Sequence, residues 1–204
     1  MINALLLMFS PVPTWERIAA AQRKWGSILA GHLVPLLLLA SVAEGSGLVH
    51  WGKPHGNVPH FRTLSLAQAV RFETAQLFLS LAVVLLAAKL IKSLGETFHG
   101  RHSFGQAFTV AAYGLGPLFL LRMLNAFPWI SPWLTWAVGI SFTAAILYHG
   151  LPRVMQPDPP HALGLYLMTV LILVMITGLL CFLTDWYLEG KFTGLYAVLS
   201  QLTQ

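Results

Sequence analysis

Five long apolar stretches dominate this sequence, and each has the length of a helix that crosses a lipid bilayer. Such a helix needs roughly 17 to 25 predominantly apolar residues. We expect the five spans at residues 27–43, 66–92, 107–124, 132–148 and 162–183. The chain has 9% charged residues, whereas soluble domains have roughly 25%. The expected fold is therefore all-α, a polytopic membrane bundle of five transmembrane helices.

Shorter aromatic and charged segments flank the spans. Residues 1–26 predict an interfacial N-terminal segment, residues 27–184 a five-helix membrane domain, and residues 185–204 a short interfacial tail, so interfacial helices are expected at both ends. Trp15 and Trp25 are expected at the depth of the lipid headgroups, where tryptophan is enriched. A solvated N-terminal helix is the alternative.

Polar residues at fixed offsets mark where two of the spans begin. Ser65 with Gln68, and Ser103 with Gln106, follow the capping-box pattern. In this pattern the serine hydroxyl accepts from a backbone N–H one turn on, and the glutamine side chain accepts from the N–H of the serine. Both pairs predict helix starts.

Proline and glycine predict where the helices bend and stop. Pro35 lies inside the first span and predicts a kink, because proline removes a backbone hydrogen bond. The segment 44–63 is rich in glycine, proline and histidine and is expected to be an irregular loop. Gly150 and Pro152 are expected to end the fourth helix, and Asp158 is expected to cap the fifth.

Lysine and arginine residues are unevenly shared between the two sides that five spans create. One side holds Arg17, Arg23, Lys24, Lys89, Lys92, Arg101 and Arg153. The other side holds Lys53, Arg62, Arg71, Arg122 and Lys191. Because cytoplasmic loops are the more basic ones, we expect a cytoplasmic N-terminus and an outside C-terminus, in the cytoplasmic (inner) membrane of a bacterium.

Three short pieces of sequence occur in order along the chain. They are FSPVPTWERIA before the first span, AYGLGPLFL within the third, and LYHGLPRVM followed by HALGLY between the fourth and fifth. These resemble the Yip1 domain family, in its bacterial branch. The first is similar to the family's Pro-x-x-x-Trp-x-x-Ile opening, the second to its Tyr and Pro, and the third to its Gly-Leu-Pro turn. The resemblance runs from about Pro11 to Leu183.

The resemblance implies a five-helix membrane domain with a cytoplasmic N-terminus. Eukaryotic members take part in membrane trafficking and bind small GTPases of the Rab type. Their long cytoplasmic N-terminal region has little counterpart here, since the first span begins at about Ser27. GTPase binding is therefore not carried over. For bacterial members the resemblance implies no settled activity.

The third span contains a run that predicts a broken helix. Tyr113, Gly114, Gly116 and Pro117 follow one another closely. Glycines let helices approach each other, and a proline frees a carbonyl at membrane depth. The break predicts either a cavity or a site for a partner helix, and ordinary packing around a kink is the alternative.

Charged residues near the ends of spans are a second group of candidates. Arg122, Asp185 and Glu44 are close enough to the predicted membrane edge to extend into the headgroups, and anchoring is favoured over a role in transport. Arg71 and Glu73 are close in sequence and are expected to pair.

The turn between the fourth and fifth spans contains a third group. Tyr148, Gly150, Pro152 and Arg153 are expected to face the cytoplasm, where Arg153 is suited to dock a partner or a lipid headgroup. A simple helix stop is the alternative. The complete set of partner-binding or cavity candidates is Trp15, Tyr113, Gly116, Pro117, Arg122, Tyr148, Gly150, Pro152 and Arg153.

Signals for chemistry are weak. His50, His55 and His60 recur every five residues, a spacing that matches neither a helix face nor a known metal pattern, and we expect no metal and no cofactor. The pair at His99 and His102 is weaker still. The sequence contains no Ser/His/Asp order, HExxH or phosphate-binding loop, so we expect no enzyme.

The function expected from these features is that of a non-enzymatic membrane scaffold or adaptor. Its expected partners are membrane lipids and another membrane protein, with no nucleic acid, and a homo-oligomer is allowed. The alternative is a small permease or channel with a cavity at the broken third helix, in the stretch from Gly114 to Pro117.

Overall fold

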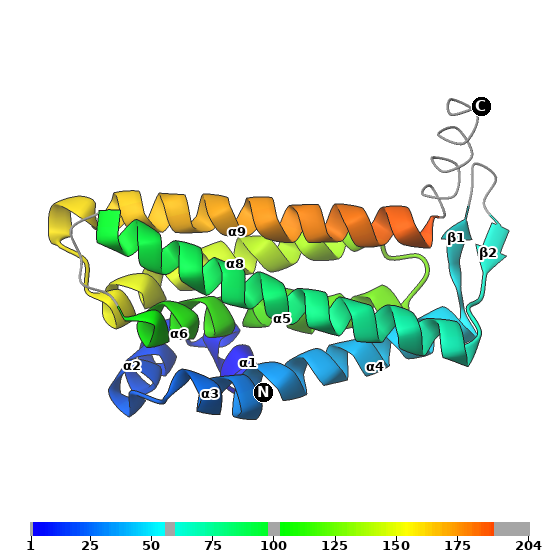
Figure 1. Ribbon diagram of the computed structural model, residues 1–204, viewed down its shortest axis with the longest axis horizontal. Coiled ribbons are helices and arrows are strands. Elements are labelled where there is room, and N and C mark those ends of the chain that lie inside the picture. The colour runs from blue at the N-terminus through cyan, green and yellow to red at the C-terminus, as the bar shows by residue number, and fades with distance from the viewer. Residues whose placement is uncertain (1, 56–59, 98–102, 190–204) are drawn as a thin grey trace, which may run out of the picture.

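The computed structural model describes residues 2–55, 60–97 and 103–189. These residues form an elongated bundle of long helices with a small strand hairpin at one end, the hairpin end, and α2 at the other, the α2 end (Figure 1). The elements are α1 (Ile2–Phe9), α2 (Pro11–Ala21), α3 (Trp25–Ile28), η1 (Leu29–Leu33), α4 (Val34–His50), β1 (Lys53–His55), β2 (His60–Arg62), α5 (Leu66–Thr97), α6 (Phe104–Gly114), α7 (Gly116–Arg122), η2 (Met123–Ala126), α8 (Pro132–Met155) and α9 (Pro159–Leu188).

Five helical segments within the described residues are long and apolar enough to cross a membrane. They are Trp25–His50, Leu66–Thr97, Phe104–Ala126, Pro132–Met155 and Pro159–Leu188. These segments confirm the five spans and the all-α bundle expected from the sequence. Each helical segment is longer than the apolar run from which it was predicted, because helical backbone hydrogen bonds continue into the more polar residues at its ends. The interfacial placement of residues 1–26 and 185–204 stays a prediction.

The first span is irregular where proline predicted a kink. Its helix changes to a π-helical turn, η1 at Leu29–Leu33, immediately before the proline at position 35. The expected loop at 44–63 is wrong in its first third, because α4 continues to His50. Gly47 lies so close to the backbone of Ala126 that no side chain fits between them. This close packing holds the helix past its glycines. After α4, β1 and β2 form an antiparallel hairpin.

Both capping boxes predicted from the sequence are present. At the start of α5 the Ser65 N–H donates to Gln68 Oε1 at 3.0 Å, and the Gln68 N–H donates to Ser65 Oγ at 3.3 Å. The same reciprocal pair joins Ser103 and Gln106 at the start of α6. Asp158 is the N-cap residue of α9, as expected, although its side chain makes no capping hydrogen bond.

The third span is broken as predicted, between α6 and α7 at Leu115. The break is filled by neighbouring side chains. A Cβ atom placed on Gly114 would lie 2.7 Å from Leu147 Cδ2, and one on Gly116 would lie 3.1 Å from Ala4 Cβ. The two glycines therefore let α8 and α1 pack closely against the break, so that space is taken by packing.

The expected end of the fourth helix is wrong. Gly150 and Pro152 lie inside α8, which continues to Met155 and ends where Gln156 adopts φ of 46°. The indole of Trp15 packs directly on Gly150, and this buried contact holds the helix through the glycine. Pro152 is exposed and lies in the last turn of α8.

Helices α1 and α2 pack against the bundle and contribute side chains to its core. Ala4, Leu7 and Trp15 are fully buried, and the Trp15 Nε1–H donates to the Ile146 carbonyl oxygen at 2.9 Å. Trp15 is therefore enclosed by the protein and not exposed to lipid, and its expected position at the depth of the headgroups stays a prediction. Trp25 is 46% exposed, which leaves its expected interfacial position as a prediction.

Candidate functional site

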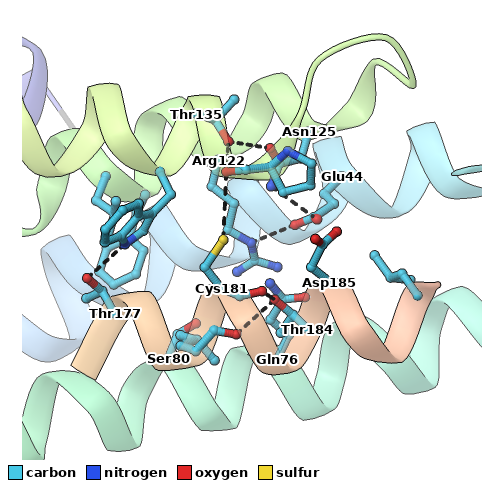
Figure 2. Close-up of a pocket in the computed structure, with 16 residues that line it drawn as sticks. Glu44, Gln76, Ser80, Arg122, Asn125, Thr135, Thr177, Cys181, Thr184 and Asp185 are labelled. Atoms are coloured by element: carbon cyan, nitrogen blue, oxygen red, sulfur yellow. Dashed lines mark hydrogen bonds and ion pairs between the residues drawn. The ribbon is translucent and has the colours of Figure 1, made fainter. Parts of the chain in front are cut away.

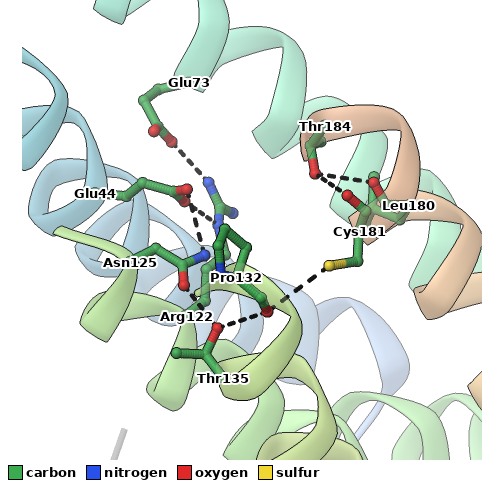
Figure 3. Close-up of polar contacts among 9 residues, drawn as sticks. All are labelled: Glu44, Glu73, Arg122, Asn125, Pro132, Thr135, Leu180, Cys181 and Thr184. Atoms are coloured by element: carbon green, nitrogen blue, oxygen red, sulfur yellow. Dashed lines mark hydrogen bonds and ion pairs between the residues drawn. The ribbon is translucent and has the colours of Figure 1, made fainter. Parts of the chain in front are cut away.

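A buried ion-pair cluster joins three helices near the hairpin end. Arg122, the last residue of α7, donates from Nε to Glu44 Oε2 at 2.6 Å and from Nη2 to Glu73 Oε2 at 2.7 Å. Glu44 belongs to α4 and Glu73 to α5, and none of the three side chains is more than 9% exposed. Figure 3 shows the guanidinium held between the two carboxylates.

Two neutral residues extend this cluster to α8. Asn125 Nδ2 donates to Glu44 Oε1 at 3.4 Å, and Thr135 Oγ1 lies 2.6 Å from Asn125 Oδ1 and 2.9 Å from the Pro132 carbonyl oxygen (Figure 3). The chain supplies these side chains from η2 and the first turn of α8, which a short turn connects. The polar network therefore ties together five helical segments, α4, α5, α7, η2 and α8.

The local geometry favours an arginine at the end of α7. Arg122 occupies the last turn of α7, where a cation is stabilised by the negative end of the helix dipole. Gly47, which lets α4 pack closely against η2, lies three residues after Glu44. This close packing places Glu44 beside Arg122. Burying charged side chains is costly unless they are paired and hydrogen-bonded. In this cluster Arg122 is both paired with and hydrogen-bonded to the two carboxylates.

The charge balance at the cluster leans negative. Two carboxylates share one guanidinium, and Lys53 of β1 is close enough for Glu44 and Asp185 to favour its charged form. Burial is nevertheless the larger effect and lowers the pKa of Lys53 from its ordinary value of 10.5. Among the described residues its Nζ has no hydrogen-bond partner.

A cavity of about 60 Å³ opens beside the cluster. Arg122 and Gln76 lie on its polar side, together with Ser80, Thr184 and Asp185 from α5 and α9 (Figure 2). Its apolar wall is formed by Leu118, Phe119, Trp136, Leu180 and Leu188. The site is thus an amphipathic pocket between α5, α7, α8 and α9, and we call it the Arg122 pocket.

Two expectations about these charges are wrong. Arg122 and Glu44 do not extend to the membrane edge, because each finds its counter-charge inside the bundle. Arg71 does not pair with Glu73 either: its Nε donates to the Ala67 carbonyl oxygen at 3.2 Å, while Glu73 binds Arg122. Asp185 accepts from the exposed Trp133 Nε1 at 3.0 Å.

Five of the candidate residues gather in the core nearer the α2 end. Trp15 and Tyr113 meet edge to face with ring centroids 6.4 Å apart, and Gly150 and Gly116 are the close-packing sites already described. His32 stacks on Tyr113 at 4.3 Å. Pro117 is buried in the first turn of α7. These side chains form a packed interior.

The other candidates lie on the surface. Arg153 donates from Nη1 to the His149 carbonyl oxygen at 2.8 Å, and its Nε lies 3.6 Å from Glu16 Oε1. Exposed Pro152 precedes it. Tyr148 is 58% exposed and lies against Tyr166 with ring centroids 5.5 Å apart. The candidate residues around the turn between the fourth and fifth spans therefore do not form a single site.

Arg153 borders a polar groove at the α2 end, with a volume of about 660 Å³. Its walls come from α2, the start of α6 and the end of α8. Arg23, Gln106 and Gln156 line it together with Arg153. Because these walls are distant in sequence, only the folded bundle creates the groove, which we call the Arg153 groove.

Sequence reasoning missed the partners of Arg122. Glu73, Asn125, Thr135 and Gln76 were not singled out as site residues, and Glu44 was taken for an anchor. A signal did exist: Glu44 and Glu73 are acidic residues in or beside apolar runs of a chain with seven acidic residues. Intramembrane acids of this kind usually face a partner inside the bundle.

The histidine pattern gives no site in the described chain. Residues 2–55, 60–97 and 103–189 contain no group of three or more His, Cys, Asp or Glu side chains placed to hold a metal ion. His50 Nδ1 lies 2.8 Å from the Ser46 carbonyl oxygen. His55 and His60 are opposite each other in the hairpin register, and His99 and His102 lie outside the described residues.

The five apolar spans and the bundle define this chain as a polytopic, multi-pass membrane protein of the all-α class. The chain belongs to the Yip1 domain family, whose domain matches residues 5–182. That match confirms the family resemblance and covers nearly all of the described bundle. Comparison with curated proteins and with solved structures finds no match.

Proposed function

We propose that this Yip1-family protein is a non-enzymatic adaptor that holds another membrane protein through the Arg153 groove. The single observation that supports this proposal is the position of a partly exposed arginine on a wide polar groove at the end of the bundle. In the proposed orientation this end faces the cytoplasm of a bacterium, with the N-terminus inside. The proposed ligand is an acidic segment of the partner.

The charge of the groove supports an acidic ligand. Arg23 and Arg153 line it. Glu16 is the acidic neighbour of Arg153, but the pair is 3.6 Å apart and its side chains are 32% and 62% exposed. Exposed ion pairs are weak, so an incoming carboxylate can compete for the arginine.

Photo-crosslinking in native membranes tests the proposal, with a probe placed on the groove at Gln156. We expect a specific membrane protein to be captured, and Arg153→Glu to abolish capture without changing expression or membrane insertion. Arg71→Glu, an exposed charge reversal at the hairpin end, is the matched control and should leave capture unchanged. Capture that survives Arg153→Glu would refute the adaptor proposal at this groove.

Other outcomes of the same experiment are informative. Capture of lipid alone would replace the protein ligand by an anionic headgroup, and capture of the chain itself would indicate a homo-oligomer. Substituted-cysteine labelling from each side of the membrane, at Gln22 and at Trp51, tests the proposed orientation. The permease alternative is not favoured, because Leu147 and Ala4 fill the break in the third span.

A further inference from the structure

Two buried polar atoms in the Arg122 pocket have no hydrogen-bond partner among the described residues. They are Arg122 Nη1, a donor, and Gln76 Oε1, an acceptor. Arg122 is 9% exposed and Gln76 is 7% exposed, and both line the same cavity. Leaving such an atom unsatisfied costs roughly 1–3 kcal/mol. A ligand that both accepts and donates a hydrogen bond could therefore satisfy these two atoms of the pocket.

A hydroxyl group is both a donor and an acceptor, and so matches the hydrogen-bonding needs of these two atoms. Its oxygen accepts from the Arg122 guanidinium while its hydrogen is donated to Gln76 Oε1. An ether or ester oxygen accepts only and would leave the glutamine unsatisfied. Ser80, which also lines the cavity, offers a further hydroxyl that can donate or accept. The Thr184 hydroxyl donates to the Leu180 carbonyl oxygen at 2.9 Å and can therefore only accept.

The surrounding charges select against ionic ligands. The carboxylates of Glu44, Glu73 and Asp185 face Arg122 and Lys53 across this region, so an anion meets a site that already has a surplus of acid. A cation would have to face the unpaired side of the arginine. An uncharged group avoids both penalties.

The apolar wall and the size of the cavity specify the rest of the ligand. About 60 Å³ holds about four to six waters at 10–15 Å³ for each. That space accommodates a hydroxyl and a few carbons. Leu118, Phe119 and Leu180 then contact the carbons next to the hydroxyl. We propose that the Arg122 pocket binds the hydroxyl end of an uncharged lipid alcohol.

Photo-labelling of the full chain in phosphatidylcholine nanodiscs tests this proposal. The probe is a diazirine-bearing hexadecanol, compared with the matching methyl ether and the matching carboxylic acid. We expect the alcohol to label peptides from α5 or α9. The ether and the acid should label these peptides about two- to tenfold less, as expected for one lost hydrogen bond of about 0.5–1.5 kcal/mol.

Variants separate the pocket from general lipid contact. Gln76→Leu removes the acceptor without creating a buried charge and should reduce labelling by the alcohol about two- to tenfold. Thr169→Val is the matched control. Thr169 is a fully buried residue of α9 whose hydroxyl also lacks a partner within the described part of the chain, and it does not line the cavity. Its labelling should equal that of the wild type.

The proposal is overturned if the acid labels as well as the alcohol, if Gln76→Leu labels normally, or if no probe reaches the pocket and it holds water alone. If the alcohol labels as expected, competition by unlabelled diacylglycerol or by oleyl alcohol identifies which source of the hydroxyl binds. This experiment is independent of the Arg153 groove, so failure of the adaptor proposal leaves it unaffected.

Discussion

The indole Nε1 of Trp15 donates a hydrogen bond of 2.9 Å to the carbonyl oxygen of Ile146, across 131 positions of sequence. This bond fixes α2 against the middle of α8 and lets the fully buried ring bring its only donor into the core. The N-terminal helices are consequently part of the folded bundle, and the walls of the Arg153 groove depend on them.

The bond predicts how a single replacement will behave. Trp15→Phe keeps most of the apolar surface but loses the donor, so we expect the free energy of unfolding to fall by about 1–2 kcal/mol. Denaturant unfolding in detergent micelles, followed by circular dichroism, measures the change. Trp129→Phe is the control, since Trp129 is 70% exposed. Equal stability of the two variants would contradict the prediction.

Gly150→Ala tests the same contact from the opposite side. A Cβ atom there would lie 2.1 Å from Trp15 Cε2, so the indole or the helix must move, at an expected cost of about 1–3 kcal/mol. Gly26→Ala is the matched control, because no heavy atom lies within 4 Å of its added Cβ. Thermal unfolding should show a lower midpoint for the first variant only; a normal midpoint would mean that α2 is not held here.

Arg122 should be indispensable only while its two carboxylates are charged. Arg122→Met alone leaves Glu44 and Glu73 buried without a counter-charge, and we expect a loss of about 3–5 kcal/mol. Adding Glu44→Gln and Glu73→Gln removes that burden and should restore most of the stability. Unfolding measurements on the single and triple variants test this, and a triple variant as unstable as the single one would disprove it.

Lys53 predicts a pH dependence of stability. Burial lowers its pKa below 10.5 in the folded state, so at neutral pH the folded chain bears the cost of a buried ammonium. That cost disappears as pH rises from the lowered pKa to 10.5, and stability therefore rises over this window. Lys53→Met should be more stable than the wild type at neutral pH, by a margin that shrinks towards pH 10.5.

The control for this pH series is Lys89→Met, which replaces an exposed lysine of α5 and should show no such trend. Unfolding titrations at several pH values provide the comparison. A Lys53→Met protein less stable than the wild type at neutral pH would show that the ammonium group stabilises the fold.

Features that depend on short stretches of chain were predictable. The spans follow from apolar length, the capping boxes at Ser65 and Ser103 from a three-residue offset, and the break at Leu115 from its flanking glycines and proline. Each rests on interactions within one or two helical turns. The Yip1 resemblance was also recognisable, because it rests on short motifs that can be read directly from the sequence.

Features that depend on which helix lies beside which were not predictable in this way. Gly150 was expected to stop α8, but Trp15 covers it. Arg122 was expected to extend to the membrane edge, but it forms buried ion pairs with Glu44 and Glu73 instead. At Gly150 the long-range contact outweighs a local preference of about 1 kcal/mol.

The sequence by itself determined the class of this protein, because a chain with so few charges and five long apolar runs satisfies its backbone and surface only as a bundle of membrane helices. The tertiary structure alone decided where its polar groups act. Packing at Gly47 and at the broken third span sets three charged side chains from separate helices in one buried cluster, with a pocket beside them. No spacing along the chain encodes that meeting, since it depends on the distances between helices.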